Sequence, residues 1–231
     1  MTAESPSSAS LLLESLLRRG WMETARAALE ERRFDRVRGT ETHGRVAVAE
    51  LFPRGGRSAA AASEYQPVPA PLFRAAIGQV PQAARERAFV DLGCGKGRAL
   101  LLAAEAGYRA LRGVELSAPL AATASENLAK TALRLGHPLD VSIRSADATT
   151  RRFERDEDTV FLFHPFGARQ VRVVARALVE SLDAHPRTIW IVYVNPVHGA
   201  VFGESSRIRE LAVGRTRIPG TLDWVVFEAG G

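Results

Sequence analysis

The sequence predicts an α/β protein with a doubly wound, mostly parallel seven-stranded sheet, a C-terminal antiparallel hairpin and a small N-terminal cap of helical and β structure. From residue 64 onward, short apolar runs alternate with helical segments, which is typical of parallel strands covered on both faces. The last two strand-like runs have no helix between them, and this favours an antiparallel hairpin. With 231 residues, 46% of them hydrophobic, the chain can bury the core that such a domain needs.

The N-terminal part of the chain is expected to form a separate cap and linker, at 1–63, ahead of the main domain at 64–231. Residues 10–20 and 22–33 have a helical pattern, and Gly20 stands between them as a stop or bend. The cap is therefore predicted to be largely helical.

Two further segments of the cap have a different pattern. Val46 and Val48 alternate with small residues, which predicts a short strand or hairpin in place of a helix. Residues 54–63 are small and flexible in composition, as is typical of a linker. We therefore expect some β structure before the linker.

Inside the main domain, the predicted elements follow one another in the order of a doubly wound sheet. Ser117 can cap the helix that follows it, and Pro119 is tolerated in the first turn of that helix. Pro219 and Gly220 join the last two strands. Strands are expected at 88–92, 111–115, 139–145, 159–163, 188–194, 207–215 and 221–229, and helices at 71–80, 97–107, 118–136 and 168–183.

The chain is basic, with a formal net charge of +5 and an isoelectric point near 10.1. Its lysines are Lys96 and Lys130, so the other basic residues are arginines, and they are scattered along the chain. Proteins that bind phosphates usually concentrate such charge on one face, whereas a biased genomic base composition gives the same excess of arginine with no partner implied. A nucleic-acid partner is therefore possible but not favoured.

The sequence favours a cytoplasmic protein without a membrane partner. Cys94 is the single cysteine, so no disulfide can form within the chain, as fits a reducing compartment. The N-terminal leucines follow no basic segment and are interrupted by Glu14, which makes a poor signal peptide. No apolar stretch approaches the roughly 20 residues that are needed to cross a bilayer.

A glycine-rich loop follows the first strand of the main domain. The loop does not fit the phosphate-binding motif, because Val90 occupies the position of that motif's first glycine. It does not fit the dinucleotide fingerprint either, because Arg98 replaces the last glycine. Its pattern is an acid followed by G-x-G-x-G, formed by Asp91, Gly93, Gly95 and Gly97.

The acids around this loop favour a cationic nucleoside as the ligand. The Asp91 carboxylate would repel a pyrophosphate and would suit an ammonium or sulfonium group. Glu115 closes the next strand, 24 positions after Asp91, where a carboxylate can accept both ribose hydroxyls. An amine-bearing, cationic adenosine derivative is S-adenosylmethionine.

Residues from about 64 to 229 resemble class I methyltransferases, whose four motifs occur here in order. "VDLGCGKG" resembles the first motif, which lines the methionine part of S-adenosylmethionine, and "GVELS" resembles the second, with Glu115 on the ribose. "SADATT" resembles the third, which places Asp147 against the adenine amino group, and "FLFHPFG" resembles the fourth, which contacts the methyl acceptor. The resemblance implies a cofactor site made of Asp91, Gly93, Cys94, Gly95, Gly97, Glu115 and Asp147.

The segments "FDRVRGTETHG" and "EYQPVPAPLF" resemble a narrower, poorly characterised group of bacterial methyltransferases. The likeness implies that the segment before the first motif folds over the cofactor, with Tyr65 and Pro67 as its contacts. That group has Asn-Pro-Phe at the fourth motif, where this chain has His164-Pro165-Phe166. A mechanism that depends on an asparagine amide is therefore not implied.

The acceptor side of the site is expected beyond the carboxyl ends of two adjacent strands, where His164 and His198 lie. His164 is the best-placed candidate base. Cys94 has no helper base and is predicted to pack beside the ligand, and the remaining histidines lie in separate segments, so no metal site is expected. The predicted catalytic residues are His164 and Tyr193, and the predicted substrate-binding residues are Pro165, Phe166, Asn195 and His198.

These features predict an S-adenosylmethionine-dependent methyltransferase that acts on a nitrogen, less favourably an oxygen, of a protein side chain or small molecule. Methyl transfer from a sulfonium chiefly needs proximity and alignment, and an amine can lose its proton to solvent or a carbonyl, whereas an oxygen acceptor has more need of a base. One alternative is a nucleic-acid methyltransferase, although the signature Asn-Pro-Pro-Tyr is absent. Another is a non-catalytic scaffold, against which the retained Asp91 and Glu115 argue.

Overall fold

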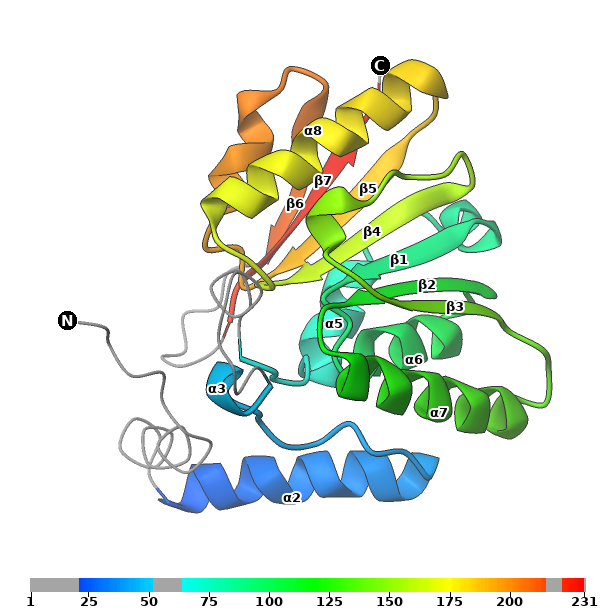
Figure 1. Ribbon diagram of the computed structural model, residues 1–231, viewed down its shortest axis with the longest axis vertical. Helices are drawn as coiled ribbons and strands as arrows, with labels where there is room; N and C mark the ends of the chain where they lie inside the picture. Colours follow the sequence, from blue (N-terminus) through cyan, green and yellow to red (C-terminus); the bar gives the residue numbers. More distant parts are fainter. Residues whose placement is uncertain (1–20, 52–63, 215–221, 231) are drawn as a thin grey trace.

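The computed structural model describes residues 21–51, 64–214 and 222–230, and these form a central sheet with helices on both faces (Figure 1). The described strands pair in the order β3-β2-β1-β4-β5-β7-β6. Their bounds are β1 Ala88–Leu92, β2 Ala110–Glu115, β3 Asp140–Ser145, β4 Glu157–Phe163, β5 Ile189–Val194, β6 Ile208–Gly214 and β7 Trp224–Ala229.

Strands β1 to β5 run parallel, and β7 lies antiparallel between β5 and β6. This confirms the predicted doubly wound, mostly parallel seven-stranded sheet with a C-terminal antiparallel hairpin. The sheet order changes direction at β1 and β4, so the connections that leave these two strands pass to opposite faces of the sheet. A ligand site is expected in the crevice between such strand ends.

Two helical layers bury the two faces of the sheet. Helices α5 (Ala70–Ile77), α6 (Arg98–Glu105) and α7 (Ala118–Leu135) cover one face, and α8 (Ala168–Ala184) covers the other (Figure 1). Side chains of β1 alternate between the layers: Phe89 packs toward α5 and α6, whereas Val90 packs toward α8. Burial on both faces explains why these strands are almost continuously apolar in sequence.

The described part of the predicted cap contains α2 (Trp21–Arg38), α3 (Val48–Leu51) and the segment between them. The predicted second helix is present and runs five residues further than expected, to Arg38. The prediction of a strand through Val46 and Val48 is wrong in its second half. Val46 forms an isolated antiparallel bridge with Tyr65, but the carbonyl of Ala47 then accepts the N–H groups of Glu50 and Leu51, which closes a helical turn.

Ser117 does not cap α7 in the predicted way. Its hydroxyl is buried and makes no hydrogen bond, and its backbone N–H donates to the carboxylate of Glu115. Pro119 lies in the first turn of α7 as expected, and Gly136 ends the helix. The predicted helix at 10–20, the linker at 54–63 and the turn at Pro219 and Gly220 lie outside the described residues.

No helix in the described ranges is both long and apolar enough for a transmembrane segment. These same ranges contain no cluster of three His, Cys, Asp or Glu side chains that could hold a metal ion.

Candidate functional site

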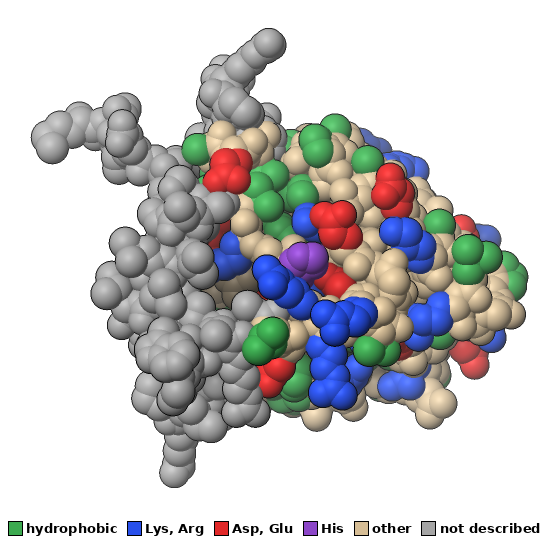
Figure 2. Space-filling view, turned by 90° about the horizontal axis from the view of Figure 1, so that it is seen from below, with side chains coloured by type: hydrophobic (Ala, Val, Ile, Leu, Met, Phe, Trp, Pro, Cys, Tyr) green, Lys and Arg blue, Asp and Glu red, His purple; other side chains and the backbone are tan. Residues whose placement is uncertain are grey.

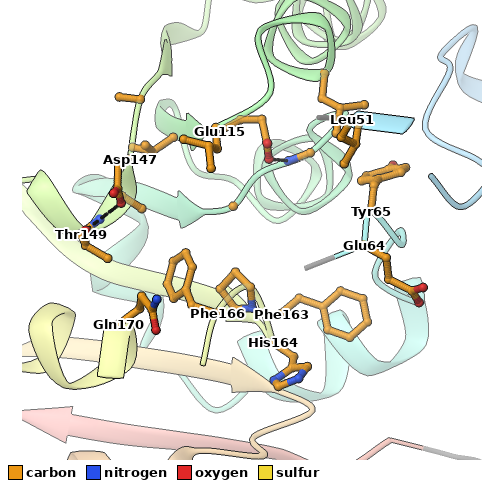
Figure 3. A pocket seen from close by; sticks show the side chains of 18 of the residues that line it. Leu51, Glu64, Tyr65, Glu115, Asp147, Thr149, Phe163, His164, Phe166 and Gln170 are labelled. Atoms are coloured by element: carbon orange, nitrogen blue, oxygen red, sulfur yellow. Dashed lines mark hydrogen bonds between the residues drawn. The ribbon is translucent and has the colours of Figure 1, made fainter. Parts of the chain in front are cut away.

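Two joined pockets open at the carboxyl ends of the parallel strands. The larger, here called the main pocket, lies between Glu115, Asp147, Phe166 and Tyr65 and holds about 740 Å³ of empty space with its open mouth included (Figure 3). The smaller, here called the side pocket, holds about 270 Å³ and reaches Asp91 near the C-terminal end of β1. Both pockets are lined by Tyr65, Gln66, Gly93 and Phe163, so these four residues mark the junction.

The glycine loop forms the floor of this junction because two neighbours approach its backbone too closely for side chains. Gly93 has φ +83, and a Cβ atom there would lie 2.7 Å from Cβ of Pro165. Gly95 has φ +52, and a Cβ atom there would lie 2.3 Å from the ring of Tyr65. Both positions therefore need glycine for conformation and for space.

Two other loop residues that the resemblance places at the cofactor do not line the main pocket, although Cys94 lines the side pocket. Gly97 is the N-cap of α6 and packs against Ala124 and Leu128 of α7, and it lines neither pocket. The Cys94 thiol is buried against Gly113 of β2, and burial, followed by the charges of Asp91 and Glu115, raises its pKa well above its ordinary value. A thiol held in this neutral form is a poor nucleophile.

Glu115 is tied to the glycine loop by hydrogen bonds. Its carboxylate accepts the backbone N–H of Gly95 at 2.8 Å (Figure 3) and that of Ser117 at 2.8 Å. Burial raises the pKa of Glu115, and these two N–H groups offset part of the rise. The side chain thus holds an acceptor group at the wall of the main pocket.

Asp91 is a buried carboxylate at the end of the side pocket. Its side chain is 3% exposed and accepts no hydrogen bond from any residue that the structure describes. Burial raises its pKa well above the ordinary range, and the nearby charge of Glu115 raises it further. Two desolvated acids this close together favour a ligand that brings positive charge and hydrogen-bond donors.

Asp147 lies at the other end of the main pocket, in the turn after β3. Its Oδ1 accepts the backbone N–H of Thr149 at 2.8 Å and the hydroxyl of Thr149 at 2.7 Å, which caps the short helix η2 (Ala148–Thr150) (Figure 3). Oδ2 has no such partner within the described ranges. The turn therefore fixes the carboxylate while one oxygen stays available to a ligand.

The turn after β4 supplies the wall opposite Glu115. Pro165 and Phe166 line the main pocket. His164 has φ +41, and its ring turns away from Glu115 toward the end of β5 (Figure 3), where it meets the ring of His198 at 5.7 Å between centroids. Nδ1 of His164 is buried without a partner. Burial lowers the pKa of His164, and the neighbouring His198 lowers it further, so the ring is neutral near pH 7.

The structure does not bring Tyr193 to either pocket. Its ring is fully buried beneath the sheet end and packs edge-on against Phe202. Burial raises the pKa of Tyr193 to about 12, and the nearby N–H of His198 offsets part of the rise. Asn195 and His198 also lie outside both pockets, although His198 touches His164.

Sequence reasoning missed several residues of the site. Phe163, the last residue of β4, could have been found from its place at a strand end. Arg98 could have been found from its place directly after the glycine loop. Leu51, Glu64 and Gln66 come from the cap and its connection to α5, and no motif marks them. Pro67, which was expected over the cofactor, lines the side pocket.

The strand order and the helices on both faces give the chain the architecture of class I, Rossmann-like methyltransferases. More particularly, residues 90–180 match the family described as a methyltransferase domain. That range carries the glycine loop, Glu115, Asp147 and the turn at His164. No curated protein matches the chain in sequence.

Similar solved structures agree with the fold. A protein of Escherichia coli, yhhF, described as a methyltransferase, has a TM-score of 0.55 and 12% identity over 70% of this chain and 87% of its own. The tRNA (m1A22) methyltransferase TrmK of B. subtilis has a TM-score of 0.53 and 14% identity over 72% of this chain and 68% of its own. An S-adenosylmethionine-dependent O-methyltransferase of Thermotoga maritima has a TM-score of 0.51 and 17% identity over 72% of this chain and 67% of its own.

Proposed function

We propose that the chain is a methyltransferase that uses S-adenosylmethionine, with the adenosyl part in the main pocket and the amino-acid part in the side pocket. The observation that carries the proposal is the pair of joined pockets with a carboxylate in each: the partly buried Glu115 in the main pocket and the buried Asp91 in the side pocket. A dinucleotide would place a pyrophosphate between these acids, at a high electrostatic cost. A cationic nucleoside lowers that cost.

The residues of the two pockets take distinct roles in this proposal. Glu115 accepts the ribose hydroxyls, and Asp147 accepts the adenine amino group through its available oxygen. Asp91 compensates the ammonium group in the side pocket. The rings of Tyr65 and Phe163 stand at the junction, where a sulfonium would lie and where aromatic faces stabilise a cation.

The bound cofactor supplies an activated methyl group, so the protein mainly has to align the acceptor with it. We place the acceptor at the mouth beside Pro165, Phe166 and His164. The neutral His164 can take a proton from an acceptor that is a weak acid, and the backbone carbonyls of the same turn can orient an amine. These features support a nitrogen acceptor on a protein side chain or a small molecule, with oxygen as the less favoured atom.

We also propose that residues 21–51 act as the cap of this site. Leu51 lines the main pocket, and the bridge between Val46 and Tyr65 joins the cap to the residues at the pocket junction. Residues 64–231 then form the cofactor-binding domain, to which the cap adds one wall.

Calorimetric titration with S-adenosylhomocysteine tests the proposal. S-adenosylhomocysteine is the product form of the cofactor, with a neutral thioether in place of the sulfonium. It needs no acceptor, so binding can be measured before the acceptor is known. We expect one site per chain and no binding of NAD under the same conditions. Tight binding of NAD, or the absence of any binding of S-adenosylhomocysteine and S-adenosylmethionine to folded protein, would refute the assignment.

A nucleic-acid acceptor is the second candidate, and one observation favours it. Figure 2 shows Lys and Arg side chains gathered on the face that lies on the side of α2 in Figure 1. The exposed Arg32, Arg33 and Arg36 of α2 make no ion pair with any described residue. If this face binds phosphates, affinity for RNA falls steeply with salt and the slope decreases when these arginines are replaced. If RNA does not bind, or binds with an affinity that does not depend on salt, the nucleic-acid acceptor is ruled out and the protein or small-molecule acceptor remains.

A further inference from the structure

The ring of Tyr65 is the wall that the two pockets share, and its position depends on a residue of the cap. The side chain is 8% exposed and lies against Gly95 of the glycine loop. Its hydroxyl does not point into a pocket. It donates a hydrogen bond to the backbone carbonyl of Thr42 at 2.5 Å. The place of Thr42 therefore sets the place of the ring over the loop.

Thr42 is in turn held by the buried carboxylate of Asp35, near the C-terminal end of α2. Asp35 is 3% exposed. Its Oδ2 accepts the backbone N–H of Thr42 at 2.8 Å and that of His43 at 2.7 Å. Its Oδ1 accepts the hydroxyls of Thr42 at 2.7 Å and Thr40 at 2.8 Å. One carboxylate thus gathers the N–H and O–H groups of the turn that carries Thr42.

The other side of Thr42 is fixed by α6, the helix that begins at the glycine loop. Nε of Arg98 donates to the hydroxyl oxygen of Thr42 at 2.7 Å, and Nη2 of Arg98 lies 4.0 Å from Asp35. The guanidinium stacks on the ring of Phe34 at 4.4 Å. Thr42 is therefore clamped between the cap and the first residue of α6, and the hydroxyl of Thr42 both donates and accepts.

The same turn is attached to the glycine loop at a second point. The side-chain amide of Asn127 on α7 donates to the carbonyls of Glu41 and Lys96 and accepts the N–H of Glu41. The distances are 3.0, 2.9 and 2.9 Å respectively. The cap turn and the loop that holds the cofactor in the proposed function are thus fastened to one side chain, which keeps them in a fixed relative position.

We propose that Asp35 is a positioning residue of the cofactor site: it holds Thr42, whose carbonyl fixes the Tyr65 hydroxyl, so that the ring closes both pockets over Gly95. The proposal rests on the proposed function, because it concerns the same pockets. A purely structural role would make Asp35 important for stability alone. A positioning role makes it act on ligand affinity through Tyr65.

A double-mutant cycle with S-adenosylhomocysteine as the probe separates these roles. Tyr65→Phe removes the hydrogen bond and keeps the ring, and we expect it to weaken binding about three- to tenfold. Asp35→Asn alone is expected to weaken binding by a similar or larger factor. In the Tyr65→Phe background, Asp35→Asn should weaken binding less than about twofold further, because the link through which it acts is already cut.

Tyr108→Phe is the matched control. Tyr108 is also a buried tyrosine whose hydroxyl hydrogen-bonds a threonine, Thr159, at 3.0 Å, but it lines neither pocket. This variant should bind the probe as the wild type does, and Asp35→Asn should keep its full effect in its background. If Asp35→Asn does not fold, Thr42→Val, which removes the hydroxyl and keeps the carbonyl, takes its place in the cycle.

The outcomes are distinct. Multiplicative effects of Asp35→Asn and Tyr65→Phe on affinity, or an unchanged affinity in Asp35→Asn, would overturn the positioning role while the proposed function stands. If the folded wild type does not bind the probe, the proposed function itself fails, and the positioning role fails with it. We expect the loss of affinity in the double variant Asp35→Asn, Tyr65→Phe to be smaller than the product of the two single losses. We expect no such shortfall when Asp35→Asn is combined with Tyr108→Phe.

Discussion

The carboxylate of Glu115 accepts the backbone N–H of Gly95 at 2.8 Å, so the end of β2 is joined directly to the glycine loop at the end of β1. The same carboxylate accepts the N–H of Ser117 at the start of α7. One acidic side chain thus sets the shape of the loop and presents acceptor oxygens to the main pocket. Its removal is expected to affect ligand binding more than folding.

Glu115→Gln tests this relationship. We expect the affinity for S-adenosylhomocysteine to fall by about 1.5–3 kcal/mol, roughly ten- to hundredfold, because charge-assisted hydrogen bonds to the ligand are lost. Glu157→Gln is the control, since Glu157 is a buried acid that pairs with Arg151 at the opposite end of β4. The control should lower the melting temperature and keep the affinity. Equal affinities in the two variants would show that Glu115 has no part in binding.

Asp91→Asn is expected to separate stability from binding. The folded-state pKa of Asp91 is raised, so the folded protein holds this proton at pH values where the unfolded chain has lost it. The free energy of unfolding therefore falls as pH rises above the ordinary value of 3.8 toward the raised pKa. The neutral amide removes this penalty, so the ligand-free variant should melt at a higher temperature near pH 7.

The same variant should bind S-adenosylmethionine more weakly, because the ammonium group loses its counter-charge. Binding by the wild type should also weaken as pH falls below the raised pKa of Asp91, since the carboxylate is then neutral. Calorimetric titrations from acid to neutral pH check both points. A variant that is less stable than the wild type at neutral pH and binds equally well would contradict this account of Asp91.

Neighbouring rings at the mouth of the pocket predict a measurable coupling. Burial and His198 both lower the pKa of His164, so NMR titration should place it below the ordinary value of 6.5. His198→Gln should raise the pKa of His164 without restoring 6.5, because burial is the larger cause. His137→Gln, at the far end of α7, should leave it unchanged. A pKa of His164 that does not respond to His198→Gln would mean that the two rings do not interact in solution.

His164→Ala extends this test to the proposed acceptor side. The ring points away from Glu115, so affinity for S-adenosylhomocysteine should stay within about twofold of the wild type, below the effect of one lost hydrogen bond. Calorimetry on the folded variant measures this directly. A larger loss of affinity would show that His164, which lines the main pocket, contacts the cofactor directly.

The elements that the sequence predicted well are those whose burial is set by local pattern. The strand Ala88–Leu92 and the helix Arg98–Glu105 follow directly from an apolar run, a glycine loop and an alanine-leucine repeat. Asp91 and Glu115 were found because strand order brings the ends of neighbouring parallel strands together. Their places at the walls of the two pockets follow from the ends of β1 and β2.

The rest depended on contacts between distant segments. The turn at Val48 became helical because Tyr65, 17 positions further on, takes the bridge at Val46 and leaves the next residues to close on Ala47. Tyr193 was expected at the rim, but the alternation of side chains along β5 points it into the core against Phe202. Asp35 carries no motif, and its role depends on Thr42, Arg98 and Tyr65 meeting in space.

A final prediction concerns the close approach of Tyr65 to the glycine loop. Gly95→Ala and Gly136→Ala both place a side chain at positive φ, +52 and +69 respectively, but only at Gly95 would the new Cβ meet the ring of Tyr65, at 2.3 Å. Gly136 has nothing within 4 Å. We therefore expect Gly136→Ala to cost about 1–2 kcal/mol of unfolding free energy through conformation alone. Gly95→Ala should cost about 1–3 kcal/mol more through the clash and abolish ligand binding. Chemical denaturation measures both.

Because the ring is the obstacle, Tyr65→Ala should recover part of the stability that is lost in Gly95→Ala and none of the stability that is lost in Gly136→Ala. Equal recovery in the two backgrounds would show that the ring does not press on the loop.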